Sequence, residues 1–353
     1  MQCERGLSAV GAIWVDRSLS AKSEKTEEQT AKAPLGLRLK AWWEGYDADE
    51  LARRQKSDHE PVVETPAEAE AEEPDAAPVE DKRPEMPWDE KRTEIAQFVW
   101  GRGFCGPGGP EHIVSLSKML ALTPEKSVLV LGAELGGPTR TLAKNFGAWI
   151  SGYEESEELV ETGNQISEAM GLAKKAGLYH YNYEKPKPFD RQFDRVFSKE
   201  ALFTVRRKKE LVNTIEPFIK GDGLFLVTDY VVDNATVLSS PEIRQWAKKE
   251  PKEPYLLTFH EMLEIMKNVN LSIRVNEDIT EQYIKLIADS WAGADKLAED
   301  LVARGEKGTG LIETLWNEAE FWARRSKLLE NGILKVWRIV AHKKELKKMM
   351  SDW

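Results

Sequence analysis

The sequence is poor in cysteine, with only Cys3 and Cys105 among its 353 residues. Two cysteines cannot build a disulfide framework, and they cannot complete a structural zinc site without other ligands. The histidines, cysteines and carboxylates also do not cluster at the spacing of metal ligands. The composition therefore excludes a disulfide-stapled fold, predicts no metal site, and is typical of a reducing compartment.

Long hydrophobic runs are missing as well. A membrane-spanning helix needs about 18 or more consecutive apolar residues, and no stretch of the sequence reaches that length. The apolar stretch GLSAVGAIWV at residues 6–15 is interrupted early and is not followed by a convincing cleavage site. We therefore expect no transmembrane segment and a cytoplasmic location.

Excess positive charge is the third absence. The formal net charge is −10, and residues 58–81 alone hold ten Asp or Glu and no Lys or Arg. The rest of the chain is therefore neutral overall, and no basic patch predicts contact with nucleic acid. The acidity belongs to one segment and says little about the partners of a folded part.

The composition divides the chain into four parts. Residues 1–33 are polar and irregular, and residues 57–90 form an acidic linker rich in Pro, Ala and Glu. Neither part can bury enough apolar area to offset the entropy of ordering, so both are predicted to be disordered. Residues 34–56 form a short amphipathic docking segment between them, and residues 91–353 are the predicted folded domain.

The docking segment carries one apolar stripe. Its members recur at helical spacing, with one further aromatic beside them: Leu35, Leu39, Trp42, Trp43 and Tyr46. Such a stripe indicates a helix that docks on a partner protein or, less favoured, on a membrane surface. A helix this short is marginal alone in water, so packing on the chain's own folded domain is an equal alternative.

Beyond Trp88 the sequence alternates between strand and helix patterns, which predicts an α/β fold with a mostly parallel sheet covered on both faces. The predicted strands are residues 127–133, 149–156, 178–183, 193–200, 224–232, 271–279 and 332–344. The predicted helices are residues 137–146, 157–177, 208–223 and 258–270, and a mainly helical stretch at 280–331 separates the last two strands.

The stretch VLVLGAELGG at residues 128–137 indicates a ligand loop after the first strand. Gly132, Gly136 and Gly137 would let the backbone approach a ligand at a helix N-terminus. Glu154 ends the second strand about twenty residues after the loop begins, where an acid can accept hydrogen bonds from ribose hydroxyls. Together they predict a nucleoside ligand, although a glycine-rich turn alone is often only a tight connection.

Several motifs occur in one order over residues 94–343: FVWGRGFCGPGG, VLVLGAELGG, GYEES, FDRVFSKEALFTV, LFLVTDYV and LKVWRIVAHK. In this order they resemble the class I S-adenosylmethionine-dependent methyltransferases, most closely the phosphoethanolamine N-methyltransferase group. The resemblance implies a Rossmann-like seven-stranded sheet with an antiparallel last strand and a helical insertion near the cleft. It also implies S-adenosyl-L-methionine as the cofactor.

The same resemblance implies roles for loop residues. Gly132, Gly136 and Gly137 would line the methionine and ribose portion of the cofactor, and Glu154 would hold the ribose. Residues 100–109 would form an N-terminal flap over the cofactor. The alternative is that the glycines of the flap are simple turns.

On the acceptor side, the resemblance implies that Ser198 and Glu200 lie between cofactor and acceptor. Asp229 and Tyr230 correspond to the pair that faces the acceptor's head group, and we take them as the candidate catalytic residues. Structural alternatives are that Ser198 caps a strand end and that Tyr230 packs in the core.

Four positions depart from the family's pattern. Val130 stands where an acid is usual, and Glu134 stands where a central glycine is usual. Tyr183 aligns with an Asp that hydrogen-bonds adenine, so it keeps a stacking face and loses a good acceptor. Thr204 aligns with a catalytic histidine, and a threonine cannot take a proton near neutral pH. His112, near the flap, is the remaining histidine nearest to a replacement.

These departures favour a methyltransferase-like protein with lost or impaired catalysis, which binds S-adenosyl-L-methionine weakly or not at all. Such a protein would act as a binding or scaffold protein through its docking segment. The alternative is an active enzyme that methylates a small-molecule amine such as phosphoethanolamine. Glu154, the flap and the VTDYV motif favour this alternative.

Overall fold

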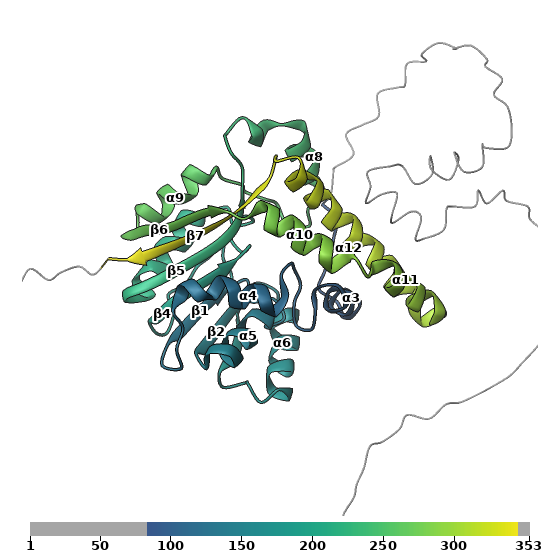
Figure 1. Ribbon diagram of the computed structural model, residues 1–353, viewed down its shortest axis with the longest axis horizontal. Coiled ribbons are helices and arrows are strands. Elements are labelled where there is room, and N and C mark those ends of the chain that lie inside the picture. Colours follow the sequence, from purple (N-terminus) through teal and green to yellow (C-terminus); the bar gives the residue numbers. More distant parts are fainter. Residues whose placement is uncertain (1–82, 345–353) are drawn as a thin grey trace, which may run out of the picture.

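The computed structural model describes residues 83–344, drawn in colour in Figure 1. The predicted tail, the docking stripe and most of the acidic linker lie outside these residues. Within the last part of the predicted linker, Met86 and Trp88 already pack against the hydrophobic core. Helix α3 (Glu90–Trp100) begins directly afterwards, with the Asp89 carboxylate capping its N-terminus.

The centre of the fold is one seven-stranded sheet in the order β3-β2-β1-β4-β5-β7-β6 (Figure 1). Strand β7 is antiparallel to both of its neighbours, and the other pairs are parallel. The strands are β1 (Ser127–Leu131), β2 (Trp149–Glu154), β3 (Ala176–His180), β4 (Phe193–Lys199), β5 (Ile219–Val231), β6 (Leu271–Asp278) and β7 (Lys335–Lys343). This arrangement confirms the predicted Rossmann-like methyltransferase fold.

Both faces of the central strands are buried, as expected for a covered parallel sheet. On β1, Val128 and Val130 belong to one hydrophobic cluster, and the alternate residues Leu129 and Leu131 belong to a second cluster on the other face. This division follows from the two-residue period of a strand. It explains why the first strand reads as a continuous aliphatic run.

Helices cover both faces of the sheet (Figure 1). The helices between α3 and the insertion are α4 (Gly109–Ser117), α5 (Gly137–Phe146), α6 (Glu157–Ala169), α7 (Lys208–Ile215), α8 (Pro241–Lys249) and α9 (Phe259–Lys267). Short 3-10 turns cover Lys118–Leu120, Glu216–Phe218 and Val237–Ser239. Helix α5 has the predicted bounds, with Pro138 in its first turn and Gly147 as a left-handed C-cap.

Several predicted elements differ in their bounds. The helix expected to reach residue 177 ends at Ala169, and Gly171 follows with a positive φ. The helix expected over residues 208–223 ends earlier, because residues from Ile219 onward already belong to β5. Strand β3 ends at His180 rather than residue 183. Helices α3, α4 and α8 were not predicted.

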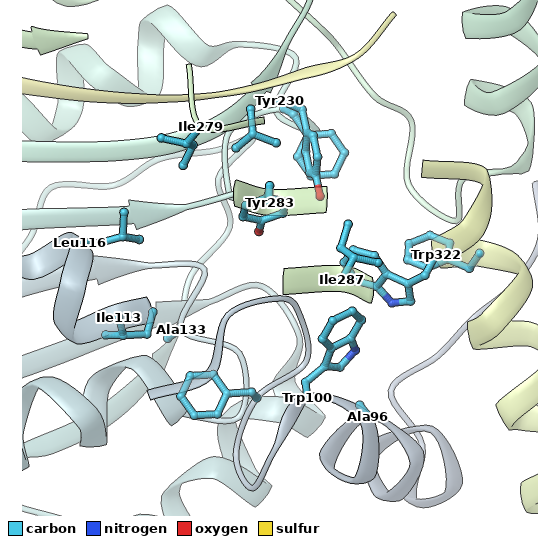
Figure 2. Close-up of a cluster of buried hydrophobic side chains, with 14 of the residues drawn as sticks. Ala96, Trp100, Ile113, Leu116, Ala133, Tyr230, Ile279, Tyr283, Ile287 and Trp322 are labelled. Atoms are coloured by element: carbon cyan, nitrogen blue, oxygen red, sulfur yellow. The ribbon is translucent and has the colours of Figure 1, made fainter. Parts of the chain in front are cut away.

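The helical insertion between β6 and β7 consists of α10 (Thr280–Trp291), α11 (Ala294–Ala303) and α12 (Glu306–Glu330). It packs beside α3, at the side of the sheet away from α9 (Figure 1). Figure 2 shows Trp100, Tyr283, Ile287 and Trp322 gathered in one buried cluster, so the insertion shares the core of the sheet. Among residues 83–344, no helix is long and apolar enough to cross a membrane.

Candidate nucleoside site

A cavity of about 330 Å³ lies at the carboxyl ends of β1, β2 and β4. This volume falls within the range of roughly 300–1,000 Å³ that is usual for small-molecule sites. Its lining comes from the glycine-rich loop, the flap, α3, the strand ends and α12. The lining residues are Met86, Trp88, Arg92, Cys105, Gly106, Gly132, Glu134, Glu154, Glu155, Leu159, Tyr183, Lys199, Glu200, Ala201, Phe203, Thr204, Pro251, Lys252, Glu318, Phe321, Trp322 and Arg325.

The loop between β1 and α5 has three residues in the left-handed region: Gly132, Glu134 and Gly136. A Cβ on Gly132 would lie 2.7 Å from the backbone oxygen of Lys199, so the loop passes close to the end of β4. Glu134 adopts the same region with a side chain, which costs about 1–3 kcal/mol. Gly132 and Glu134 line the cavity, and their predicted contacts with a ligand stay predictions.

Gly136 and Gly137 face other protein groups. A Cβ on Gly136 would meet the guanidinium of Arg140, and a Cβ on Gly137 would meet the backbone oxygen of Gly103. The amide of Gly137 donates to that Gly103 oxygen at 2.8 Å. The first free amide of α5 is therefore bonded to the flap, and neither glycine is among the residues that line the cavity.

Glu154 lies at the end of β2 and holds the loop by its backbone. Its carboxylate accepts from the amides of Glu134 at 2.9 Å, Glu155 at 2.8 Å and Ser156 at 3.3 Å. Burial raises its pKa to about 7, although these amides lower it. Because a carboxylate has about four acceptor positions, one remains for a ligand hydroxyl.

The Tyr183 hydroxyl joins β2 to the loop. It donates to the backbone oxygen of Tyr153 at 2.7 Å and accepts from the amide of Gly132 at 2.8 Å. The side chain is buried and lines the cavity. Tyr183 thus braces the loop beside Val130, whose own side chain lies in the hydrophobic core.

A buried ion cluster occupies the space between the loop, the flap and β4. The fully buried Lys199 ammonium lies 3.3 Å from Glu134 Oε1 and 2.9 Å from Glu200 Oε2. Burial lowers the pKa of Lys199, but the two carboxylates outweigh burial and raise it above its usual range. The other Glu134 oxygen accepts from the flap amide of Cys105 at 2.8 Å.

The second oxygen of Glu200, Oε1, is buried without a hydrogen-bond partner among the described residues. Burial raises the pKa of Glu200, while Lys199 and the nearby Tyr283 hydroxyl lower it. Glu200 thus lines the cavity with one carboxylate oxygen that the described residues leave without a hydrogen bond.

The remaining predicted site residues lie behind this surface. Ser198 is fully buried, and Asp229 accepts from the amides of Leu202, Phe203 and Tyr230. These bonds fix the turn after β4, and burial raises the pKa of Asp229 to about 7. Ser198, Asp229 and Tyr230 are not among the residues that line the cavity, and their predicted roles toward a ligand stay predictions.

The wall opposite the loop was not foreseen from the sequence. Arg92 of α3 pairs with Glu318 of α12 at 2.5 Å, and both side chains are buried. Arg325 binds Glu250 with two nitrogens, at 2.6 and 3.2 Å. Both pairs lie among aromatic rings.

A sequence signal for this wall did exist. Glu318, Phe321, Trp322 and Arg325 recur at spacings of three, one and three residues, which places them on one face of a helix. A face that mixes charges with aromatics is unusual for a core helix and is typical of a cavity wall. The partner of Glu318, Arg92, carried no comparable local signal.

Thr204 lines the cavity at the position where the resemblance predicted a histidine. His112 is buried on α4, and it is not among the lining residues. Burial lowers its pKa to about 4, so its ring is neutral near pH 7. Among residues 83–344, no group of three or more His, Cys, Asp or Glu is arranged to hold a metal ion.

Comparison with known proteins finds methyltransferases. Phosphoethanolamine N-methyltransferase 3 of Arabidopsis thaliana is 25% identical over 206 residues, which are 58% of this chain and 41% of that protein. Sterol 24-C-methyltransferase of Yarrowia lipolytica is 26% identical over 200 residues, which are 53% of this chain and 52% of that protein. The chain thus matches about half, or less, of the length of these curated relatives.

Solved structures share the fold at low sequence identity. Phosphoethanolamine N-methyltransferase 2 of Haemonchus contortus, in complex with S-adenosyl-L-methionine, has a TM-score of 0.62 and 18% identity, covering 71% of this chain and 56% of that chain. The cyclopropane synthase MmaA2 of Mycobacterium tuberculosis has a TM-score of 0.60 and 13% identity, covering 72% and 95%.

The profile of the family described as mycolic acid cyclopropane synthetase matches residues 111–307, more than half of the chain. This range contains the glycine-rich loop, Glu154 and the ion cluster after β4. The chain therefore belongs to the mycolic acid cyclopropane synthetase family of class I S-adenosylmethionine-dependent methyltransferase domains.

Proposed function

We propose that this chain is a methyltransferase-like protein whose cavity accepts a nucleoside, whose methyl transfer is lost or impaired, and which acts as a binding or scaffold protein. One observation carries the proposal: the ionised groups of the cavity are satisfied largely by one another. Glu154, Gly132 and Leu159 line one part of the cavity, which we call the nucleoside half. This half fits a ligand, because the Glu154 carboxylate keeps one acceptor position. The other half is lined by the Glu134, Lys199 and Glu200 cluster.

The lining cations support this function, because each is already paired. Arg92 binds Glu318, Lys199 binds Glu134 and Glu200, and Lys252 binds Glu155; Arg325 binds Glu250. A phosphorylated acceptor would need an unpaired cation. The described lining offers none, and it contains no histidine to serve as a base.

S-adenosyl-L-methionine, when bound, would supply an electrophilic methyl group. In this chain, Glu154 would hold one ribose hydroxyl, Gly132 would allow close backbone approach, and the flap would exclude water. Among the described lining residues, no side chain serves both as an unpaired base and as an unpaired group that could hold an amine acceptor. Transfer would then rest on positioning alone.

Calorimetric titration with S-adenosyl-L-methionine tests the proposal directly. The full chain should bind with a Kd closer to ~1 mM than to ~1 μM. Mass spectrometry should find no methylated product from ethanolamine, phosphoethanolamine or sarcosine. Tight binding together with methyl transfer to any of these amines would refute the proposal.

The scaffold role rests on the stripe of Leu35, Leu39, Trp42, Trp43 and Tyr46, which lies outside the described residues. Large aromatics on a long tether are suited to capture a protein partner. A partner retained by the full chain should be lost on Trp42→Ala with Trp43→Ala and kept on Glu50→Gln. If both variants retain the partner equally, the stripe does not bind it, and the scaffold role proposed for the stripe is wrong. A cytoplasmic location, based on the two cysteines, is part of the same proposal.

The second candidate is an active enzyme that methylates a small-molecule amine such as phosphoethanolamine. Glu200 favours it, because Glu200 lines the cavity and its buried Oε1 has no hydrogen-bond partner among the described residues. A carboxylate with a raised pKa can accept a proton from an ammonium group. Under this candidate, Glu200→Gln abolishes turnover, and Glu264→Gln, at an exposed glutamate outside the cavity lining, does not.

A further inference from the structure

The side chain of Glu134 points across the cavity from the loop to the flap and β4. One oxygen accepts from the Cys105 amide at 2.8 Å, and the other lies 3.3 Å from the Lys199 ammonium. A Cβ placed on Gly106 would lie 3.4 Å from Glu134 Oε1, the oxygen that contacts Lys199, so the flap backbone closes directly over the carboxylate. The carboxylate is thus held by one backbone donor and one cation.

A backbone amide together with an ammonium group is also what recognises the α-carboxylate of an amino acid. Both donors belong to residues that line the same cavity as Glu154. Glu134 occupies both donors with a carboxylate of its own. A second carboxylate would have to share Lys199 with Glu134 and Glu200, and three anions around one buried ammonium repel one another.

We infer that the Glu134 carboxylate takes the place of a ligand's α-carboxylate, so that the cavity selects nucleosides without an amino-acid tail over S-adenosylmethionine. The inference rests on the proposed function, because it requires the nucleoside half around Glu154. The ligand class is an adenosine whose 5′ substituent is neutral and short, such as a thioether.

The conformation of Glu134 supports this selection. Its φ of 53° lies in the region that glycine enters freely, so the chain keeps a strained backbone at this position. The strain is offset by the bonds to Cys105 and Lys199. Replacing Glu134 by glycine would relieve the backbone, free both donors and leave Lys199 paired with Glu200.

Calorimetry of the full chain with four ligands tests the inference: adenosine, 5′-methylthioadenosine, S-adenosylhomocysteine and S-adenosylmethionine. The unchanged chain should bind 5′-methylthioadenosine at least tenfold more tightly than S-adenosylhomocysteine. Glu134→Gly should improve S-adenosylhomocysteine binding at least tenfold and change 5′-methylthioadenosine binding less than threefold. The preference should therefore disappear or reverse.

Two further variants separate the causes. Glu134→Gln keeps the size of the side chain and removes its charge, so a partial gain for S-adenosylhomocysteine would show that charge contributes beside bulk. Glu264→Gln removes an exposed carboxylate that pairs with Lys267 on α9, outside the cavity lining, and it should leave the preference unchanged. Thermal melting of each variant shows that the fold is kept.

The possible failures are distinct. If the nucleosides bind but the preference for the tail-free ligands is absent and Glu134→Gly does not alter it, the inference is wrong and the nucleoside cavity stands. If no variant binds any of the four ligands, the nucleoside cavity of the proposed function is wrong, and the inference falls with it.

Discussion

At the scale of single residues, His112 makes stability depend on pH. Its ring is buried against Tyr283, and neither ring nitrogen has a hydrogen-bond partner among the described residues. Burial lowers its pKa from 6.5 to about 4. Between these two values the unfolded chain binds a proton that the folded chain does not, so stability increases with pH and is lost as pH falls.

The lowered pKa of His112 predicts a measurable loss of stability at acid pH. Lowering the pH from 7.5 to 5 should cost about 2 kcal/mol of unfolding free energy through His112. His112→Leu should remove that part of the acid sensitivity, and His260→Asn, at an exposed histidine, should retain it. Urea unfolding at both pH values measures the difference. Identical pH dependence in all three proteins would exclude His112 as its source.

Glu154 makes ligand binding depend on pH. Its pKa is raised to about 7 by burial, and only the ionised carboxylate accepts freely from ribose hydroxyls. Affinity for adenosine should therefore increase as pH rises from 6 to 8, and Glu154→Gln should weaken binding and flatten the profile. Calorimetry at pH 6 and pH 8 should show a smaller pH effect for 2′-deoxyadenosine, which lacks one ribose hydroxyl, and an equal effect for both nucleosides would contradict the prediction.

At the scale of elements, α12 is tied to the sheet domain by a buried ion pair. Arg325 binds Glu250, which follows α8, and its guanidinium lies over the rings of Phe203 and Tyr230. Removal of one partner leaves an unpaired buried charge, whereas removal of both does not. The pair therefore constrains where the insertion sits.

A double-mutant cycle measures this constraint. Arg325→Met and Glu250→Gln should each cost about 3–5 kcal/mol, and the double variant should cost clearly less than their sum. The neighbouring Arg324, in a more exposed pair with Glu320, provides the matched control. Arg324→Met should cost less than about 1 kcal/mol. Additive losses at Arg325 and Glu250 would mean that the pair is not coupled.

Local elements could be predicted from the sequence because their signals are local. Helix α5 has a proline in its first turn and a glycine at its end, and β2 ends at Glu154, as the strand pattern predicted to within two residues. The loop residues Gly132, Glu134, Glu154 and Tyr183 were also foreseen as cavity residues, since strand ends meet at one edge of the sheet.

The opposite wall could not be predicted in the same way. Arg92 and Glu318 are 226 residues apart in the sequence, and only the packing of α3 against α12 joins them. The ion cluster escaped prediction for a related reason, because the direction of the Glu134 side chain depends on the closed flap. Alignment with a family gives positions, whereas side-chain contacts depend on the substituted residues themselves.

At the scale of the whole molecule, the insertion and the sheet share one core. Trp100 of α3 packs against Trp291 of α10 and Trp322 of α12, at ring separations of 6.1 and 4.6 Å. The same hydrophobic cluster includes strand residues such as Val130 and Leu226. A contiguous core predicts that residues 83–344 unfold as one cooperative unit.

Hydrogen exchange under increasing denaturant tests whether residues 83–344 unfold cooperatively. Peptides from α12 and from β4 should converge on the same opening free energy, because neither element can lose its contacts while the shared core remains intact. Trp322→Ala should lower the opening free energy of both elements by about 3–5 kcal/mol. The exposed Phe98→Ala on α3 should change little, since half of that side chain already contacts water. An insertion that opens several kcal/mol below the sheet, with Trp322→Ala affecting α12 alone, would show instead that the cavity wall is a separate folding unit able to move away from the nucleoside half.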